Sequence, residues 1–409
     1  MKTWIIEPRD SLIVRDGRPF GLGAGIRARS LDFPFPSTTT GGVRTRAGLN
    51  RDGMFDANYI TAVKEISIAG PLLVELDKNG GIQDWLMPAP ADALIARDET
   101  DAGTVQIKPL KPINDSSALI NIKKDLLPVG IATSLKAKPL KGPNFWYSMR
   151  FKEWLLESED FVVTPNELGH DGPEKDSRVH ASLNEALTTG ETGDNNLFQT
   201  RGLEFRRGFK NDGLENVNQL ALAVFVEDSE RAQEIRPGLA PLGGERRLVA
   251  WREDVADKTS EIRQCPQEIR SKIISSSCCR LLFLTPAFFQ QGFCPEWLMR
   301  PRRGVTPVLK AMALNHYQVV SGWDFAKVKT TDDHRTVVGE PKPTRRLVPS
   351  GSVLFLELAG DREGISDWID DTWFRCVSDD DLTGPMDPRK DGFGLAVLGT
   401  WDGLPLKME

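Results

Sequence analysis

Short apolar runs separated by turn-forming residues recur along this chain, and the pattern is clearest in its second half. Runs of this length, bounded by Gly, Pro, Asn or Asp, are typical of β-strands. Apolar residues at helical spacing predict helices at 259–276 and 364–376. The strands predicted from the runs are 216–226, 248–251, 279–284, 317–323, 352–358 and 395–398. From residue 248 the elements approximate strand, helix, strand, strand, helix, strand once two neighbouring strands are merged, which is the ferredoxin-like order.

The first half of the chain shows the same pattern less regularly. A short buried strand is predicted at 3–6, and 66–76 looks like two strand segments broken at Gly70-Pro71. Between about 77 and 170 the pattern dissolves into Pro-rich sequence of mixed charge, with one helix at 147–156. We interpret this region as a large irregular insertion rather than a second core.

Two further features complete the predicted organisation. Apolar-alternating arms on both sides of a Gly/Asn/Asp-rich tip predict a long hairpin at 175–210. A glycine-rich loop leads through the last strand at 391–399. The fold class is therefore predicted to be α+β. An N-terminal domain, 1–226, would carry the insertion and the hairpin, and a C-terminal domain, 227–409, would end in the glycine-rich loop.

The segment 33–46, FPFPSTTTGGVRTR, combines features that suit an anion-binding helix start. The two Phe-Pro pairs favour an extended backbone just before the helix, and the hydroxyls at 37–40 are candidate helix caps. The two glycines leave the backbone bare, and Arg44 and Arg46 follow. A helix start presents free N–H groups and a partial positive charge, which favour phosphate. The alternative is an ordinary capped helix with surface arginines.

The net charge of −6 is unevenly distributed. Residues 1–51 contain nine Lys or Arg and four Asp or Glu, a balance of +5, which leaves −11 for the rest. A positive patch on an acidic body suits a protein that holds a phosphate chain at one face and protein partners elsewhere. Here Arg9, Arg15 and Arg18 alternate with Asp10 and Asp16. Such alternation is typical of a salt-bridged surface, although arginines beside a helix start also suit bidentate phosphate contact.

The composition excludes several classes of protein. With 40% hydrophobic and 27% charged residues it is that of an ordinary soluble protein. There is no signal-peptide-like run and no apolar stretch of membrane-span length. The five cysteines form no CxxC pair, which argues against a zinc ribbon or disulfide framework and for a reducing compartment. We therefore expect a cytoplasmic protein without membrane contact, cofactor or metal.

Candidate catalytic residues are sparse. His180 lies in a strand-like segment with no second histidine at a suggestive spacing, so a structural role is favoured. Asp32 precedes the helix in 33–46 but has no evident partner for proton transfer or metal binding. A nucleotide-binding α+β enzyme is a further alternative, and the absence of a lysine-bearing phosphate loop disfavours it.

Motifs along the whole chain match one family in order. The matching stretches are 5–20, 33–46, 177–180 with 197–205, 242–247, 285–297, 320–324, 348–356 and 391–401. They resemble the RAMP superfamily of CRISPR-associated RNA-binding proteins, whose hallmark is a glycine-rich loop before the final strand of a ferredoxin-like fold. More narrowly, they resemble the family of the third Cmr subunit of the type III-B CRISPR effector complex. The region 77–170 carries little of the resemblance.

The resemblance implies tandem ferredoxin-like (RRM-like) units in a non-catalytic subunit of an RNA-guided interference complex for antiviral defence. It implies binding of the 5′ repeat-derived tag of the CRISPR RNA and docking to the large polymerase-like Cmr subunit and the first backbone Cmr subunit. Target RNA would be met only indirectly. The hairpin 175–210 is the candidate for the thumb that displaces a base in comparable subunits. The alternative within the superfamily is an endoribonuclease acting on CRISPR or target RNA, built on Asp32 or His180.

The residues expected to contact RNA share two kinds of chemistry. Arginines and hydroxyls would bind phosphates, and the glycines of 242–247 and 391–394 would let RNA backbone run close. Phe393 would stack on a base or fill the core, and the core role is favoured. The full set is Arg9, Arg15, Arg18, Ser37, Thr38, Thr39, Gly41, Arg44, Arg46, Arg178, His180, Arg201, Gly243, Gly244, Arg246, Arg247, Gly392, Phe393 and Gly394.

Overall fold

The chain divides into two interleaved compact units. The computed structural model describes residues 1–15, 30–98, 100–114, 125–131, 138–181, 197–207, 218–255, 260–330, 336–382 and 387–407. Unit 1 consists of Met1–Gln83, Gly172–Val255 and Val319–Arg345, and unit 2 of Asp84–Asp171, Ala256–Gln318 and Arg346–Glu409. Because each unit is assembled from three segments, the division by contacts does not follow the single boundary at residue 226 that the sequence suggested.

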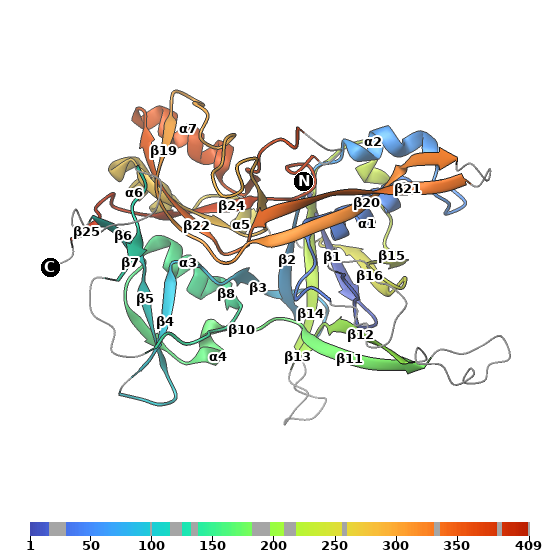
Figure 1. Ribbon diagram of the computed structural model, residues 1–409, viewed down its shortest axis with the longest axis horizontal. Coiled ribbons are helices and arrows are strands. Elements are labelled where there is room, and N and C mark those ends of the chain that lie inside the picture. Colours follow the sequence, from blue (N-terminus) through green and yellow to red (C-terminus); the bar gives the residue numbers. More distant parts are fainter. Residues whose placement is uncertain are drawn as a thin grey trace. The chain divides into compact units, whose positions relative to one another are not determined.

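An antiparallel sheet organises unit 1. Its strand order is β2-β14-β1-β16-β15, and β13 also pairs with β14 (Figure 1). Ile5 and Ile6 of β1 are fully buried, as are most residues of β14, so the core lies against these central strands. The strands are β1 (Lys2–Pro8), β2 (Ile68–Leu76), β13 (Arg206–Arg207), β14 (Asn218–Val226), β15 (Gly238–Pro241) and β16 (Leu248–Glu253). The strands predicted at 3–6, 216–226 and 248–251 are confirmed within the described residues.

The helix predicted within 33–46 is confirmed as α1 (Pro36–Ala47), which contacts β2. Gly42 lies in its interior, where an added Cβ would come within 2.8 Å of Leu242 and 3.1 Å of the Trp251 ring. This glycine therefore lets α1 approach the sheet closely. The shorter helices of unit 1 are η1 (Ala57–Tyr59), α2 (Ile60–Lys64) and η3 (Ala232–Glu234).

Strand β2 continues through Gly70-Pro71, so the prediction of two broken segments was wrong. Its pairing with β14 shifts register between Ala223 and Phe225, opposite this dipeptide. A bulge of this kind absorbs a proline that has no N–H for the ladder, and the strand need not end there.

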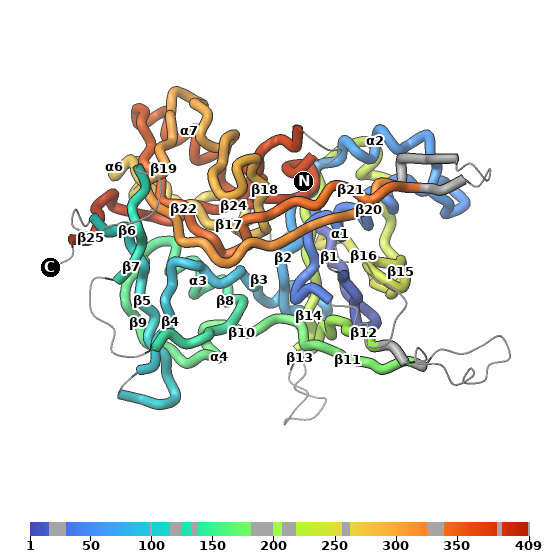
Figure 2. Tube along the Cα trace, viewed as in Figure 1, coloured from blue at the N-terminus to red at the C-terminus, as the bar shows by residue number. Residues whose placement is uncertain are grey.

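Two long hairpins lie outside the unit 1 sheet. The predicted hairpin is confirmed in its arms, β11 (Glu174–Ala181) and β12 (Leu197–Glu204), which pair antiparallel from Glu174 opposite Glu204 (Figure 2). Its predicted tip lies outside the described residues. The strand predicted at 317–323 extends as β20 (Gln318–Thr330), which pairs with β21 (Thr336–Val348); β21 also pairs with β18 (Ala287–Phe288).

Unit 2 contains an antiparallel sheet with the strand order β19-β22-β17-β24-β23. The strands predicted at 279–284, 352–358 and 395–398 are confirmed here, whereas β19 was missed. The predicted strand 248–251 pairs with β1 in unit 1 instead, so the ferredoxin-like order counted from residue 248 does not form within one sheet. The strands are β17 (Cys278–Phe283), β19 (Thr306–Ala313), β22 (Val353–Ala359), β23 (Arg375–Cys376) and β24 (Leu395–Thr400).

The helices of unit 2 follow the predictions with shifted ends. The helix at 147–156 is confirmed, but 259–276 forms two helices because Pro266 stands at the N-cap of the second. The helix predicted at 364–376 ends at Thr372, and its last residues form β23. The helices are α3 (Ser148–Leu156), α4 (Pro165–Leu168), α5 (Ser260–Arg263), α6 (Gln267–Ser276) and α7 (Arg362–Thr372). None of the helices in the described ranges is long and apolar enough to cross a membrane.

The region 77–170 is far more ordered than predicted. Ile107, Trp146 and Trp154 are at most 1% exposed, so the region builds core rather than an irregular insertion. Its strands form the orders β10-β8-β3 and β4-β5-β9, and β6 pairs with β7 and β25. They are β3 (Ile82–Pro88), β4 (Ala93–Arg97), β5 (Val105–Pro109), β6 (Lys111–Asn114), β7 (Val129–Gly130), β8 (Phe145–Tyr147), β9 (Phe161–Val163), β10 (Gly169–His170) and β25 (Leu406–Lys407).

A buried ion pair ties this region to the sheet of unit 2. Arg280 of β17 donates to Asp92 Oδ2 at 2.6 Å, and each side chain is 1% exposed. The same guanidinium donates to the carbonyls of Trp154 and Thr400, and Trp154 Nε1 donates to Asp92 Oδ1 at 2.8 Å. Since both charges have hydrogen-bond partners, the cost of removing them from water is offset only while the whole cluster is intact.

Replacing one member of this pair should therefore lower the stability of the folded chain strongly. Asp92→Ala is expected to lower the free energy of unfolding by about 3 to 5 kcal/mol, because it leaves an uncompensated buried charge. Urea denaturation measures the effect. The control is Glu357→Ala, which removes an exposed carboxylate 3.0 Å from Lys310 in the same sheet and should cost less than about 1 kcal/mol. Equal losses in the two variants would contradict the role given to the buried pair.

Candidate nucleic-acid interface

Three of the segments predicted to contact RNA meet at one place in unit 1. Leu12, just after β1, exchanges backbone hydrogen bonds of 2.9 Å with Leu203 of β12. On the next residue, the carbonyl of Ile13 accepts from the N–H of Gly244 at 2.6 Å. The segment after β1 therefore lies between the β11–β12 hairpin and the turn 242–247.

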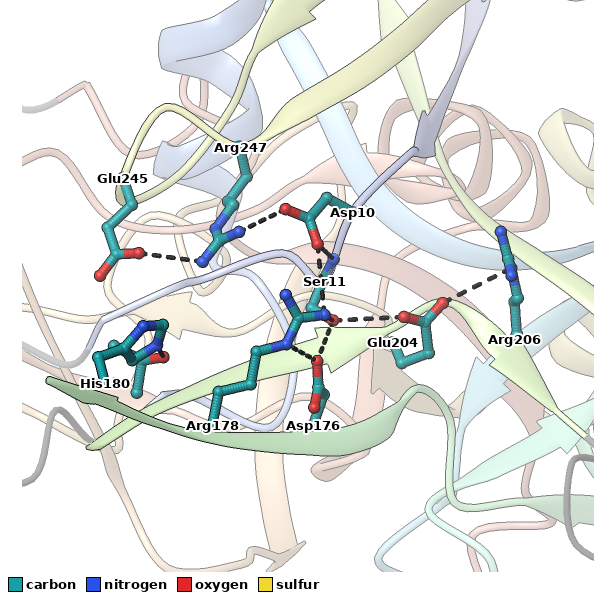
Figure 3. Close-up of polar contacts among 10 residues, drawn as sticks. Asp10, Ser11, Asp176, Arg178, His180, Glu204, Arg206, Glu245 and Arg247 are labelled. Atoms are coloured by element: carbon teal, nitrogen blue, oxygen red, sulfur yellow. Dashed lines mark hydrogen bonds and ion pairs between the residues drawn. The ribbon is translucent and has the colours of Figure 1, made fainter. Parts of the chain in front are cut away.

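Ser11 links this segment to the hairpin through side chains (Figure 3). Its hydroxyl donates to Asp176 Oδ2 at 2.6 Å, and Glu204 Oε2 lies 3.3 Å away. Arg178 donates to the Ser11 hydroxyl at 3.3 Å and to Asp176 Oδ2 at 2.7 Å. A Cβ on Gly202 would lie 2.6 Å from Ser11 Cβ, so glycine is needed for this close approach.

Asp10 links the hairpin to the turn 242–247. Its carboxylate accepts from Arg247 Nη1, and its other oxygen lies 3.5 Å from Arg178 Nη2. Arg247 also donates to Glu245 at 3.0 Å. Burial alone would raise the pKa of Asp10, but hydrogen bonds from Arg247 and Ser11 and the two arginine charges lower it overall. Burial likewise opposes the charge of Arg247, yet Asp10 and Glu245 raise its pKa.

In the described part of the chain, some arginines at this junction form ion pairs with neighbouring carboxylates and others do not. Arg178 and Arg247 are paired as described, and Arg206 lies 3.7 Å from Glu204. Arg9 lies 3.0 Å from Glu7, with about half of its side chain exposed. Arg201 and Arg246 are exposed and form no ion pair among the described residues. These two cations are therefore the ones most available to a phosphate.

The turn 242–247 shows why its glycines are needed. Gly243 has a φ of +73°, and an added Cβ would lie 2.5 Å from the Ile13 carbonyl oxygen. The backbone that approaches these glycines is therefore the chain's own, whereas RNA was predicted there. Glu245 and Arg246 follow with φ values of +55° and +51°, which are sparsely populated for residues with a Cβ. The surrounding contacts hold Arg246 in this strained turn.

Helix α1 keeps only part of the predicted phosphate site. Its N-cap is Phe35 with Pro36 at the first position, and no side-chain hydroxyl caps it, so the predicted hydroxyl cap was wrong. Thr39 is buried and donates to the Pro36 carbonyl at 3.0 Å. Ser37 and Thr38 are half-buried, which leaves the helix start accessible at these two residues, and Gly41 is exposed on the second turn.

Arg44 and Arg46 lie in the last turn of α1, away from the helix start they were expected to support. Arg44 donates to the Ile66 carbonyl at 3.1 Å. Arg46 donates to the Arg236 carbonyl and lies 5.5 Å from the centroid of the Trp251 ring. Burial lowers the pKa of Arg46. Both side chains therefore help to pack the C-terminal end of the helix.

The glycine-rich loop is interior rather than exposed. Phe393 is 0% exposed, which confirms the core role favoured for it, and its neighbours Gly392 and Gly394 are buried as well. A Cβ on Gly394 would lie 2.9 Å from the Ser378 backbone nitrogen. The predicted RNA contact of these residues has no exposed surface to act through, because protein atoms fill the space beside the glycines.

The two candidate catalytic residues are engaged in ordinary polar contacts. His180 Nε2 lies 2.8 Å from Thr200 Oγ1 across the hairpin. Asp32 forms an ion pair of 2.5 Å with Lys175 of β11. Within the described ranges no three His, Cys, Asp or Glu side chains lie close enough to hold a metal ion.

Some predicted residues were not located, and some important ones were not predicted. Arg18 lies outside the described residues, and Arg15 is exposed at their edge. The acids Asp10, Asp176 and Glu204, which hold the junction together, were not among the predicted site residues. The alternation of charge along 9–18 signalled Asp10, because it suited a salt-bridged surface, whereas nothing in that pattern signalled Asp176 or Glu204.

Comparison with known proteins gives one strong match. The family model described as CRISPR-associated protein (Cas_Cmr3) matches residues 4–401. No curated protein matches the chain in sequence. A chain of type III-B Cmr-beta bound to cognate target RNA and AMPPnP, state 1, solved by cryo-EM, is 15% identical with a TM-score of 0.43, covering 87% of this chain and 86% of that chain. A chain of type III-B Cmr-beta bound to cognate target RNA, also solved by cryo-EM, is 16% identical with a TM-score of 0.42, and the match covers 87% of this chain and 86% of that chain. A chain in the crystal structure of the Csm3-Csm4 subcomplex in the type III-A CRISPR-Cas interference complex is 10% identical with a TM-score of 0.32. That match covers 88% of this chain and 94% of that chain.

The junction in unit 1 should weaken in acid. The pKa of Asp10 is lowered on folding, so its stabilising effect is complete above the ordinary value of 3.8 and is lost as the pH falls through the lowered value. Asp10→Asn should therefore cost about 1 kcal/mol at pH 7, a modest value because the carboxylate is partly exposed. The difference from the unsubstituted chain should shrink as the pH falls below 4.

Urea denaturation at several pH values tests this. Glu253→Gln is the control, because Glu253 forms an exposed ion pair of 3.3 Å with Lys2 and should cost less than about 0.5 kcal/mol. A cost for Asp10→Asn that does not change with pH would count against the ionised carboxylate as the source of the effect.

Proposed function

Because the chain belongs to the Cas_Cmr3 family of CRISPR-associated proteins, we propose that it is a non-catalytic subunit that binds the 5′ repeat-derived tag of the CRISPR RNA. Family membership makes it a subunit of a type III CRISPR effector complex. The observation that carries the proposal is the junction of the segment after β1, the β11–β12 hairpin and the turn 242–247. There Arg201 and Arg246 remain exposed without ion-pair partners among the described residues.

The proposed RNA path follows the available cations. Arg201, Arg246 and the half-exposed Arg9 would neutralise successive phosphates, and the paired arginines would hold the hairpin at a defined angle. The accessible start of α1 would offer the backbone N–H of Ser37 and the hydroxyls of Ser37 and Thr38 to a further phosphate, and Gly41 on the next turn would present no side chain that blocks its approach. No acidic residue stands in the first turn of α1 to compete for them. Tag bases would be read as splayed single strands.

The β11–β12 hairpin is proposed as the thumb. It lies between β2 and β14 in the chain, although those two strands pair with each other, and its base is held by Ser11 and Leu12. A hairpin that is fixed at its base and extends from the sheet has the shape needed to displace a base near the junction of tag and guide. We also propose that the large polymerase-like subunit and the first backbone subunit dock on this chain, and that target RNA is met only indirectly.

The ferredoxin-like interpretation is supported in unit 1 by topology. The order β16-β1-β14-β2 is antiparallel throughout, and α1 lies between β1 and β2 in the chain. Numbered along the chain, these strands have the order 4-1-3-2 of a split βαβ unit, although only η3 stands where the second helix is expected. We propose that unit 2 carries the second such unit in a more divergent form.

Removing the available arginines should weaken RNA binding through charge. Arg201→Ala and Arg246→Ala should each lower the salt dependence, the slope of log K against log[salt], by about 0.7, the value for one phosphate contact on a single strand. Fluorescence anisotropy with a tag-sequence RNA at several salt concentrations measures it. Arg97→Ala is the matched control, because Arg97 is an exposed arginine of unit 2 without an ion pair among the described residues. Equal slopes for all three variants would refute the proposed path.

The alternative, an endoribonuclease, makes the opposite prediction in a cleavage assay. The full chain should leave CRISPR RNA and target RNA intact with or without divalent metal, because Asp32 and His180 are engaged with Lys175 and Thr200. RNA cleavage by the parent protein that disappears in Asp32→Ala or His180→Ala would establish the enzyme instead.

A further inference from the structure

Unit 2 has a cluster of arginines around one indole ring that the proposed RNA path does not use. The guanidinium carbon of Arg302 lies 4.0 Å from the centroid of the Trp297 ring, and that of Arg389 lies 4.8 Å from it. Arg300 and Arg303 flank Arg302 in the sequence. We call the segment 293–302, which carries Phe293, Trp297, Arg300 and Arg302, the Trp297 surface.

The arginines of this cluster are not equally compensated. Arg389 forms an ion pair with Asp380 and donates to the Ser378 carbonyl at 2.9 Å. Arg303 forms an ion pair of 2.8 Å with Asp371. In contrast, Nε and Nη2 of Arg302 are buried without a hydrogen-bond acceptor among the described residues. Arg300 is exposed and has no ion pair within the same ranges.

The uncompensated charge of Arg302 is a physical cost. Burial lowers its pKa, the charge of Asp371 acts in the opposite direction, and the like charge of Arg389 lowers it further. Stacking on Trp297 returns part of this cost as a cation–π interaction. A guanidinium whose buried Nε and Nη2 lack acceptors still loses more by burial than this contact returns, and an incoming carboxylate at Nη1 would supply the missing opposite charge.

The Trp297 surface is held in shape before any partner binds. The buried carboxylate of Asp379 accepts from the backbone N–H groups of Gln290, Glu296 and Trp297 at 3.0, 2.9 and 2.7 Å. It thereby pins both ends of the loop whose tip carries Phe293, a side chain that is 44% exposed. Further along the chain, Arg302 and Val305 exchange backbone hydrogen bonds of 2.9 and 2.8 Å around a tight turn. Preorganisation of this kind lowers the entropy lost on binding.

We propose that the Trp297 surface binds an Asp/Glu-rich segment of a protein partner. A carboxylate would accept from Arg300 and Arg302, and Phe293 would make the apolar contact. Trp and Arg are the residues most enriched at energetic centres of protein interfaces. Single-stranded RNA is disfavoured, because two guanidinium groups already stack on the half-buried ring that a base would need. The inference rests on the proposed function in one respect: the partner is taken to be another subunit of the same complex.

Site-specific photo-crosslinking in the assembled complex tests the proposal. The full chain, with p-benzoylphenylalanine at position 293, is expressed in its native host, and the complex is purified and irradiated. The expected product joins position 293 to a protein subunit within an Asp/Glu-rich peptide. The same probe at position 149 is the control for exposure, because Met149 is 62% exposed in α3 of the same unit, and it should not yield that product.

Charge variants decide whether the arginines carry the contact. Arg300→Gln combined with Arg302→Gln should lower the crosslink yield by about fivefold or more, the loss expected for desolvated charge contacts. Arg303→Gln is the matched control, since its charge is already paired with Asp371, and it should leave the yield unchanged. Arg302→Lys should retain most of the yield, which separates loss of charge from loss of folding.

Each other outcome overturns the inference. Crosslinks to RNA, crosslinks to a peptide without acidic residues, no crosslink at position 293, or equal losses in the Arg303→Gln control would all do so. Binding of tag RNA by the same variants is measured in parallel and should be unchanged. If tag binding is intact and the crosslink fails, only this inference is refuted, whereas a parent chain that does not bind tag RNA refutes the proposed function.

Discussion

Several of the arginines beside the proposed RNA path form ion pairs with carboxylates of unit 1. This pairing fixes the hairpin and the turn 242–247 in position and leaves few positive charges for RNA. Asp10 is shared between the hairpin and the turn 242–247, and Asp176 and Glu204 meet the hydroxyl of Ser11. The net charge of this junction is close to zero, so it positions the groups that would contact RNA and adds little long-range attraction for RNA. Affinity must then come from the few cations left outside it, which suits a protein whose net charge is −6.

Secondary structure was predictable wherever the local pattern was long enough to be read. Strands β1, β14, β17 and β24, helix α1 and the arms of the β11–β12 hairpin all carry such patterns and were located correctly. Within the region 77–170, the strands β8 and β9 were missed because they have only three residues each. An alternation of period two cannot be recognised over that length, and burial by distant segments defines these strands instead.

The site was harder to predict than the fold, because charge pairing is a property of tertiary structure. The sequence shows that Arg247 and Arg178 are basic, but their partner Asp10 is far from both along the chain. Glycine presents the same limit. Its presence at Gly244 or Gly394 signals that something approaches closely, yet only the structure identifies Ile13 and Ser378 as the neighbours. The sequence therefore indicates that something packs closely against these glycines, but it does not identify the segment that does so.

The interleaving of the units has a consequence for how the protein is made. Strand β1 leaves the ribosome first, but its neighbours β14 and β16 lie more than 200 residues later in the chain. The first segment of unit 2 is synthesised in between. Neither unit can therefore complete its core during early translation, and the contacts that close unit 1 are of very long range, which slows folding. Nascent chains of this protein should depend on chaperones until most of the sequence has emerged, and no simple truncation would yield either half as a separately folded product.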